Sequence, residues 1–206
     1  MVKKGHPLFA RVYRRVSHRL DERGAREHRR ELLGGLTGNV IEVGAGNGLN
    51  FPHYPRSVTH VTAVEPERYF RQLARQAGER AEPHVDVING AAEALPVADD
   101  AADAVVISLV LCSVPDQDVA LSEVVRVLRP GGELRFYEHV LSDDPRLARV
   151  QRFGDRTIYP MFAGGCHTSR ETVAAIRSAG LTITEMRAFD FPPPKGLPHV
   201  LGRAHI

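Results

Sequence analysis

The stretch Asn39-Val-Ile-Glu-Val-Gly-Ala-Gly-Asn-Gly-Leu-Asn50 decides the fold of this chain. Its first part, 40–43, is a short β-branched run that is typical of a buried strand. Gly44, Gly46 and Gly48 follow at alternate positions, and glycine allows a positive φ and a close approach of the backbone to a ligand. A strand that enters such a loop and then a helix indicates Rossmann-like cofactor binding. A glycine-rich turn without a ligand is the alternative interpretation of this stretch alone.

Apolar runs and helical patterns alternate along the rest of the chain. We expect strands at 40–43, 60–65, 85–89, 104–111, 133–140, 181–191 and 199–206, and helices at 67–80, 116–128, 145–155 and 168–180. Strands that alternate with helices imply an α/β fold with a parallel, doubly wound sheet. The proline-rich turn at 192–194 indicates that the last two strands form an antiparallel hairpin. Thr168-Ser-Arg-Glu171 predicts a capping box at the start of the last helix.

Length and composition favour one soluble globular domain over residues 1–206. The chain is 43% hydrophobic and 25% charged, which is ordinary for that class. Its two cysteines, Cys112 and Cys166, give neither a disulfide framework nor a Cys-rich metal site, so we expect no metal. No apolar run approaches the ~18 residues of a membrane span. The N-terminus lacks the apolar core of a signal peptide, which makes the cytoplasm the expected compartment.

The N-terminal arm, residues 1–37, is basic. Residues 1–35 carry ten Lys and Arg against four Asp and Glu, whereas the remainder carries 17 against 21. Helices are expected at 8–16 and 25–33. Because they precede the first strand, they can form a lid over the carboxyl edge of the sheet, with Tyr13 in the lid. The arm can also make weak peripheral contact with an anionic membrane surface. A solvated helical face is the alternative, and Tyr13 can equally pack into the domain.

A second acidic residue stands where a nucleotide ribose is expected. Glu65 ends the strand at 60–65, 17 residues after Gly48, and Pro66 follows it. In dinucleotide-binding folds an acid at this place accepts hydrogen bonds from the ribose hydroxyls. We therefore expect Glu65 to hold the ribose of a nucleoside cofactor.

The order of motifs is more specific than any one of them. E-V-G-A-G-N-G, V-E-P, G-A-A-E-A-L-P and R-V-L-R-P-G-G resemble the successive motifs of the class I S-adenosylmethionine (SAM) methyltransferases, across residues 38–140. The resemblance implies SAM as cofactor and a Rossmann-like seven-stranded sheet whose last strand is antiparallel. N-G-L-N-F-P-H-Y-P, L-V-L-C-S-V, Y-E-H-V, G-C-H-T-S-R-E and P-H-V-L-G are similar to the methyltransferase-like 7 group. Members of that group are membrane-associated alkyl thiol S-methyltransferases with a hydrophobic N-terminal anchor, and we expect the basic arm to stand in the place of that anchor.

The resemblance implies roles for individual residues in a cofactor site. That site consists of Glu42, Gly44, Gly46, Asn47, Gly48, Glu65, Pro66, Ala92, Glu93, Ser108 and Leu109. Glu42 would attract the cationic amino-acid end of SAM, and the glycines would surround its methionine portion. Ala92 and Glu93 fall where the family contacts adenine, although an exposed surface charge is the alternative for Glu93. Ser108 and Leu109 would border the sulfonium.

The acceptor side is expected around the carboxyl end of the fifth strand. His139 is the candidate general base, and the alternative is a histidine that orders the insertion, residues 141–169. The expected pocket residues are Tyr13, Cys112, Tyr159, Cys166 and His167. Small and apolar residues in the insertion suit a small, mostly apolar acceptor with a soft nucleophile such as a thiol. A lipid, a quinone or another small metabolite is the alternative acceptor, and Cys166 can instead be a small buried residue.

Three other classes of protein fit the sequence less well. The G-x-G-x-G spacing and the lack of a Tyr-x-x-x-Lys pair disfavour a nicotinamide oxidoreductase. The basic arm suits a nucleic-acid methyltransferase, but the fourth strand runs into Leu-Cys-Ser-Val-Pro instead of the Asn/Asp-Pro-Pro-aromatic motif of amino-methylating enzymes, so no nucleic-acid partner is expected. The intact motif set disfavours a non-catalytic SAM-binding subunit.

Overall fold

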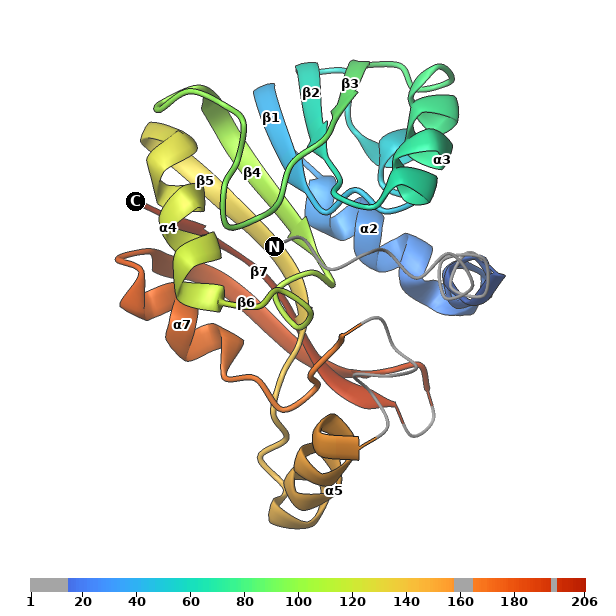
Figure 1. Cartoon of the computed structure of the whole chain (residues 1–206), viewed down its shortest axis with the longest axis vertical. Helices are drawn as coiled ribbons and strands as arrows, with labels where there is room; N and C mark the ends of the chain where they lie inside the picture. The colour runs from blue at the N-terminus through green and yellow to red at the C-terminus, as the bar shows by residue number, and fades with distance from the viewer. Residues whose placement is uncertain (1–14, 158–164, 194–195) are drawn as a thin grey trace.

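A seven-stranded sheet forms the centre of the molecule (Figure 1). The computed structural model describes residues 15–157, 165–193 and 196–206. The strands are β1 (Gly38–Val43), β2 (Val58–Val64), β3 (His84–Ile88), β4 (Ala102–Ser108), β5 (Leu128–His139), β6 (Thr182–Phe191) and β7 (Leu197–His205). Their order is β3-β2-β1-β4-β5-β7-β6, and β7 is antiparallel to both of its neighbours. The predicted α/β sheet of seven strands with an antiparallel last strand is confirmed.

Helices form close to the predicted places and most of them flank the sheet, although the expected helix at 8–16 lies outside the described residues except at 15 and 16. They are α2 (Arg26–Leu33), α3 (Arg68–Gly78), α4 (Gln117–Val127), α5 (Pro145–Thr157) and α7 (Thr172–Ser178), with a 3-10 turn, η2, at Phe51–His53. Helical residues 15–20 and a π-helical turn, η1 (Asp21–Ala25), lead into α2. Among the residues that the structure describes, no helix combines the length and the apolarity needed to cross a bilayer.

Side chains of alternate strand residues form a separate core on each face of the sheet. Ile41, Ile107 and Phe136 pack on the face that α4 and α7 cover. The other face packs against α2 and α3, through residues such as Val40 and Val106. Successive strand residues point to opposite faces, so a strand buried on both faces needs a continuous apolar run. That requirement explains why the run at 104–107 is the most apolar of the chain.

The strand order creates a switch point between β1 and β4. The chain runs outward from β1 through β2 to β3 and then returns to the other side of β1 with β4. In open α/β sheets ligands bind outside the carboxyl ends of the strands at such a point. The glycine loop follows β1 there, and Leu109 follows β4.

The fourth strand ends earlier than its apolar run predicts. It was expected to reach residue 111 but stops at Ser108. Leu109 has a φ of 59°, which turns the chain out of the sheet. The backbone N–H groups of Val110 and Leu111 then donate to the carboxylate of Glu138, at 2.8 and 3.0 Å, instead of to a strand. Apolarity therefore predicted burial correctly here but not strand geometry.

The insertion is closed at its base by two side chains of α5. Asp155 accepts hydrogen bonds from the backbone N–H and hydroxyl groups of both Thr168 and Ser169. Gln151 accepts from the N–H of Ser142 and donates to the carbonyls of Val140 and Thr168. The predicted capping box at 168–171 is therefore wrong: Thr168 bonds Asp155, and α7 begins at Thr172 without a side-chain cap.

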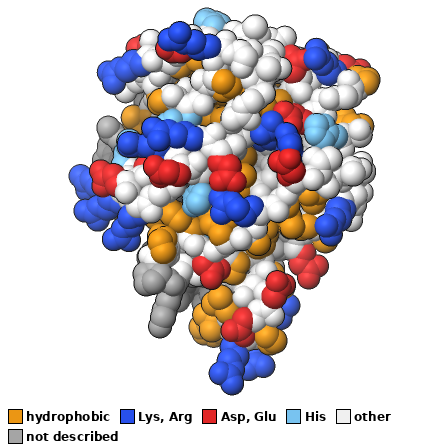
Figure 2. Space-filling model, turned by 180° about the vertical axis from the view of Figure 1, so that it is seen from behind, with side chains coloured by type: hydrophobic (Ala, Val, Ile, Leu, Met, Phe, Trp, Pro, Cys, Tyr) orange, Lys and Arg blue, Asp and Glu red, His pale blue; other side chains and the backbone are white. Residues whose placement is uncertain are grey.

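Helix α5 projects from the body of the molecule at the lower end of Figure 1. Its outer face exposes Val150 and Phe153, at 63% and 66% of their surface. Four arginines on the same helix are also exposed: Arg146, Arg149, Arg152 and Arg156. Figure 2 shows hydrophobic and basic side chains together at this projecting end.

Candidate active site

The glycine loop after β1 is shaped by backbone conformations that suit glycine. Gly44 and Gly46 have φ values of 69° and 56°. A Cβ at Gly44 would lie 2.5 Å from a methyl group of Val110, so the loop closes tightly against the segment after β4. A Cβ at Gly46 would meet no atom within 4 Å, which leaves open space beside the loop. Gly48 instead packs against Phe51, so it serves the core.

Glu65 lies beneath this loop at the end of β2. Its carboxylate is buried and accepts hydrogen bonds from the N–H groups of Gly46 and Glu67, both at 2.8 Å. Burial raises the pKa of this carboxyl, and the two backbone bonds oppose that shift. Glu65, the predicted ribose-binding acid, therefore lies beside the predicted glycine loop, although 19 residues separate it from Gly46 in the sequence.

Glu42 is held by residues whose roles were not predicted from the sequence. Its carboxylate accepts hydrogen bonds from the Asn50 amide at 3.0 Å and the Tyr54 hydroxyl at 2.6 Å. Arg29 donates to Asn50 at 2.8 Å and to Asp21 at 3.0 Å, which links the network to the N-terminal helices. Burial raises the pKa of Glu42 to about 7. Asn50 and Tyr54 belong to the quoted motif N-G-L-N-F-P-H-Y-P. Their presence in that motif, shortly after Glu42 in the sequence, was the one feature from which their contact with Glu42 could have been predicted.

A narrow pocket of about 30 Å³ opens between the glycine loop and the end of β4. It is lined by Ser17, Arg29, Glu42, Gly44, Ala45, Gly46, Asn47, Leu49, Asn50, Ser108 and Leu109. The fold thus brings together most of the predicted cofactor residues from β1 and β4. Ser17, in the helical part of the arm, accepts a hydrogen bond from the Asn47 amide at 3.2 Å, so this part of the arm contacts the glycine loop.

Two buried oxygens near the predicted cofactor edge lack a protein partner. Within the described residues, Glu93 Oε1 and Ser108 Oγ make no hydrogen bond. Buried polar atoms without a partner are rare and often await a ligand. Ala92 and Glu93 lie in the turn after β3, and Pro66 follows Glu65 after β2. These positions agree with a nucleoside stretched across the ends of β1, β2 and β3.

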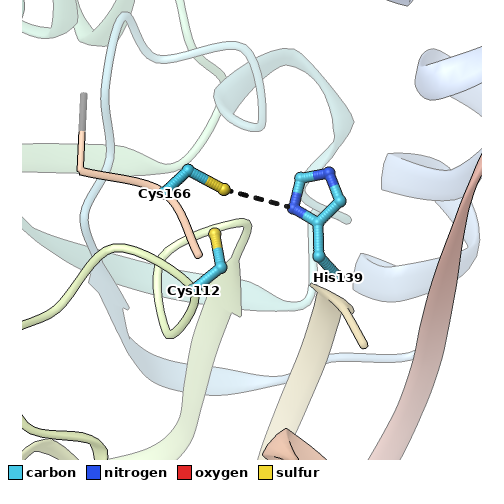
Figure 3. A group of neighbouring side chains, drawn as sticks. All are labelled: Cys112, His139 and Cys166. Atoms are coloured by element: carbon cyan, nitrogen blue, oxygen red, sulfur yellow. Dashed lines mark hydrogen bonds between the residues drawn. The ribbon is translucent and has the colours of Figure 1, made fainter. Parts of the chain in front are cut away.

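Cys112, His139 and Cys166 meet on the other side of β4 (Figure 3). Cys166 Sγ lies 3.9 Å from His139 Nδ1, and the three donor atoms all lie within 4.8 Å of one another. Cys112 is buried, whereas His139 and Cys166 are partly exposed. Hydrogen bonds with Cys112 and His139 lower the pKa of Cys166. The hydrogen bond with Cys166, together with burial, raises the pKa of Cys112.

Glu138 fixes this side of the site and was not predicted from the sequence. It is fully buried and accepts hydrogen bonds from the N–H groups of Val110, Leu111 and Cys112. Burial raises the pKa of Glu138 to about 7. The only hint in the sequence was a carboxylate near the end of a buried strand. The three donors could not be predicted from the sequence, because they lie 26–28 residues before Glu138.

His199 packs on His139 and was also not predicted. Their ring centroids lie 4.3 Å apart, and His199 donates from Nδ1 to the carbonyl of Leu197 at 2.7 Å. Burial lowers the pKa of His199 to about 3, so it is neutral at physiological pH. His167 lies beside the cluster: its N–H donates to the carbonyl of Cys112 at 2.7 Å. Tyr13 and Tyr159 lie outside the described residues.

The fold, the glycine loop and the acid after β2 define a Rossmann-like protein with a place for a nucleoside cofactor. A profile of the methyltransferase domain matches residues 41–136. The thiol S-methyltransferase TMT1B of Homo sapiens is 32% identical and covers 99% of this chain and 87% of its own length. TMT1B of Mus musculus is 34% identical over 84% of this chain and 73% of its own length. Quinone and phosphatidylethanolamine methyltransferases also match, some over only about half of this chain.

Solved structures agree on the fold. A geranyl diphosphate methyltransferase in complex with SAM superposes with a TM-score of 0.70 at 16% identity, covering 91% of this chain and 86% of its own. The chain belongs to the class I SAM-dependent methyltransferases, in the group of the thiol S-methyltransferases TMT1A and TMT1B.

The residues present fit SAM, the cofactor of this class. Carboxylates at Glu42 and Glu65 suit its amino group and ribose hydroxyls, and the open space at Gly46 leaves room for its chain. The unpartnered oxygens of Glu93 and Ser108 suit its remaining polar groups. The bound cofactor supplies an electrophilic methyl group on a sulfonium.

Proposed function

We propose that this enzyme methylates the sulfur of a small, mostly apolar thiol. The observation that carries the proposal is the match to thiol S-methyltransferases, which spans 99% of the chain for the human TMT1B, whereas some of the quinone and lipid enzymes match about half of it. The cluster of Cys112, His139 and Cys166 beside the switch point supports the same acceptor class, because it offers soft polar groups and no carboxylate among its three members.

The residues of the acceptor side have separable tasks in this proposal. A thiol has a reference pKa near ~8.5, so a modest shift makes it a thiolate at physiological pH. His139, partly exposed at the end of β5, assists that deprotonation. Glu138 sets the position of Cys112 through the backbone, and Arg29, Asn50 and Tyr54 set that of Glu42. Orientation of the nucleophile against the methyl group then supplies several kcal/mol of rate enhancement.

An acceptor panel tests the proposal. Purified protein is incubated with SAM and an alkyl thiol, the matching alcohol and amine, a quinol, phosphatidylethanolamine vesicles and a DNA duplex, and release of S-adenosylhomocysteine is measured. We expect turnover with the thiol and the methyl thioether as product. His139→Ala should lower this turnover about 10²–10⁴-fold while SAM affinity is kept. Preference for the quinol, the lipid or the DNA would overturn the thiol assignment.

We also propose peripheral contact with an anionic membrane surface from the cytoplasmic side. Support comes from the charge of residues 1–35 and from α5, which exposes Val150 and Phe153 among four arginines. A helix that presents apolar and basic side chains on its outer face is typical of interfacial binding. An apolar thiol dissolved in a membrane would be accessible to an enzyme in this position.

A further inference from the structure

Three soft donor atoms converge beside the carboxyl ends of β4 and β5. They belong to Cys112, His139 and Cys166, and Figure 3 shows the three side chains turned toward one another. They come from the loop after β4, the end of β5 and the end of the insertion, so the fold brings them together across 54 residues of sequence. Their spacing along the chain matches no metal motif, which is why the sequence predicted none.

The distances are close to those of a tetrahedral zinc site. With Zn–S near 2.3 Å and Zn–N near 2.0–2.1 Å, a sulfur and a nitrogen ligand lie about 3.6 Å apart and two sulfurs about 3.8 Å apart. The observed separation of Cys166 Sγ and His139 Nδ1 is 3.9 Å, and no pair of donor atoms exceeds 4.8 Å. A contraction of at most about 1 Å would therefore complete the geometry. Thiolate and imidazole donors select zinc over magnesium or calcium.

We propose that Cys112, His139 and Cys166 bind one zinc ion or a similar soft divalent cation. Three protein ligands leave a fourth position open, which is the arrangement of catalytic zinc sites and not of structural ones. Cys112 is buried, whereas His139 and Cys166 are partly exposed, so the accessible side of the cluster is theirs. The site then offers a coordination position to a ligand that arrives from outside.

The fourth ligand in this proposal is the acceptor thiol, and that part rests on the proposed function. When the thiol binds, its S–H bond breaks, a metal–sulfur bond forms and the proton passes to water. A metal-coordinated thiol is deprotonated outright. His139 would then assist deprotonation as a ligand and not as a general base.

Buried groups already orient two of the three ligands. Glu138 holds the backbone of Cys112, and the carbonyl of Cys112 accepts from the N–H of His167, the neighbour of Cys166. His199 packs on the ring of His139, with its own ring fixed by the bond to Leu197. Support of this kind around the ligands is a regular property of metal sites, since it lowers the cost of gathering them.

Cobalt titration tests the site without cofactor or acceptor. The protein is reduced, stripped with a chelator, and titrated with Co²⁺ under anaerobic conditions. Because the chain contains only two cysteines, sulfur-to-cobalt charge-transfer absorption reports on this cluster alone. We expect charge transfer and tetrahedral d–d bands that saturate at one Co²⁺ per chain and disappear when Zn²⁺ is added. Absence of charge transfer in the reduced, folded protein would overturn the proposal.

Substitutions separate the cluster from other sites. Cys166→Ser should remove about half of the charge-transfer intensity and His139→Ala should weaken Co²⁺ binding at least about tenfold. Cys166 is partly exposed, so this variant remains informative if Cys112→Ser fails to fold.

His84→Ala is the matched control, because it breaks a second group, His60, His84 and Asp86, on the surface of β2 and β3. Charge transfer that is unchanged in Cys166→Ser, or lost in His84→Ala, would contradict the assignment. Since no methyl transfer is measured, failure here leaves the proposed function standing.

Discussion

At the scale of single residues, this site depends on buried carboxylates that are held by neutral donors. Glu42, Glu65 and Glu138 are all buried, and the bonds described for them come from backbone N–H groups, an amide and a hydroxyl. A buried carboxylate is costly, which is why burial raises the pKa of each, even though the charge of Arg29 near Glu42 and of Arg71 near Glu65 opposes the shift. A positively charged ligand next to Glu42 would remove part of that cost.

Replacing Glu65 should weaken cofactor binding. Glu65→Ala removes an acceptor that lies against the glycine loop, so we expect a loss of ~1.5–3 kcal/mol in SAM affinity, measured by calorimetry. Glu67→Ala is the control: Glu67 caps α3 by accepting from the N–H of Phe70, so its loss should cost about 1 kcal/mol of stability and little affinity. Equal SAM affinity in Glu65→Ala and in the unchanged protein would show that Glu65 does not hold the ribose.

The raised pKa of Glu42 predicts how stability depends on pH. Its folded pKa is about 7 and its ordinary value is 4.5, so the folded state binds more protons than the unfolded state between these values. The stabilising contribution is complete below about pH 4.5 and is lost as pH rises through about 7. Urea titrations without cofactor measure this effect. Between about pH 5 and pH 8, the free energy of unfolding should fall less steeply in Glu42→Gln than in the unchanged protein.

A matched substitution checks that this effect belongs to Glu42. Glu82→Gln replaces an exposed carboxylate that is paired with Arg56, and that pair lowers the pKa of Glu82 from 4.5. Glu82 therefore titrates below the window of about pH 5 to pH 8, so this variant should leave the dependence of the unfolding free energy on pH unchanged. A Glu42→Gln protein with the slope of the unchanged chain would mean that Glu42 is already ionised at pH 5. SAM binding should also release protons near pH 7 from the unchanged protein, which calorimetry in two buffers detects.

At the scale of elements, the ends of strands decide what each side of the site can do. The end of β1 supplies the glycine loop, and the ends of β4 and β5 supply the Cys112, His139 and Cys166 cluster together with the insertion. Leu109, with its positive φ, is the point where β4 stops and the two sides separate. A strained conformation at a residue other than glycine persists because neighbouring bonds fix it. Here those bonds run to Tyr137 and, one residue later, to Glu138.

The exposed face of α5 makes a prediction about membranes. Phe153→Ser should lower binding to anionic liposomes in co-sedimentation, because it removes the largest exposed apolar side chain of that face. Binding should also decrease as salt rises, since the neighbouring arginines act through screened charge. Met186→Ser is the control, an exposed apolar side chain on β6. Equal loss in both variants, or none in Phe153→Ser, would exclude α5 as the contact.

At the scale of the whole molecule, the sequence predicted the sheet and the cofactor edge better than the acceptor side. Strand and helix periodicity is local, and the motifs after β1, β2, β3 and β4 lie at ends that a doubly wound sheet brings together. The Glu138 bonds and the meeting of Cys112 with Cys166 depend on how β5 and the insertion pack, which no local pattern encodes. The end of β4 was misplaced for the same reason: Glu138 competes for its backbone donors.

Cofactor binding should stabilise the whole domain. At a concentration of 100 times Kd, SAM should add about 2.7 kcal/mol to the free energy of unfolding and raise Tm accordingly. NAD should leave Tm unchanged, because the glycine loop has the G-x-G-x-G spacing and not the G-x-G-x-x-G of dinucleotide-binding folds. Differential scanning calorimetry with each ligand checks this, and a shift with NAD but none with SAM would contradict the cofactor assignment.

The closed base of the insertion has a consequence for how such enzymes diversify. Gln151 bonds both ends of the insertion and Asp155 bonds its second end, so changes that keep these two residues need not disturb β5 or the glycine loop. Loops joined at the base tolerate large changes of length at little entropic cost. The insertion can thus be exchanged as a unit. A chimera that carries the corresponding segment of a relative should show that relative's substrate preference. One fold could in this way acquire new acceptors in a single recombination event, without renewed selection on the cofactor half.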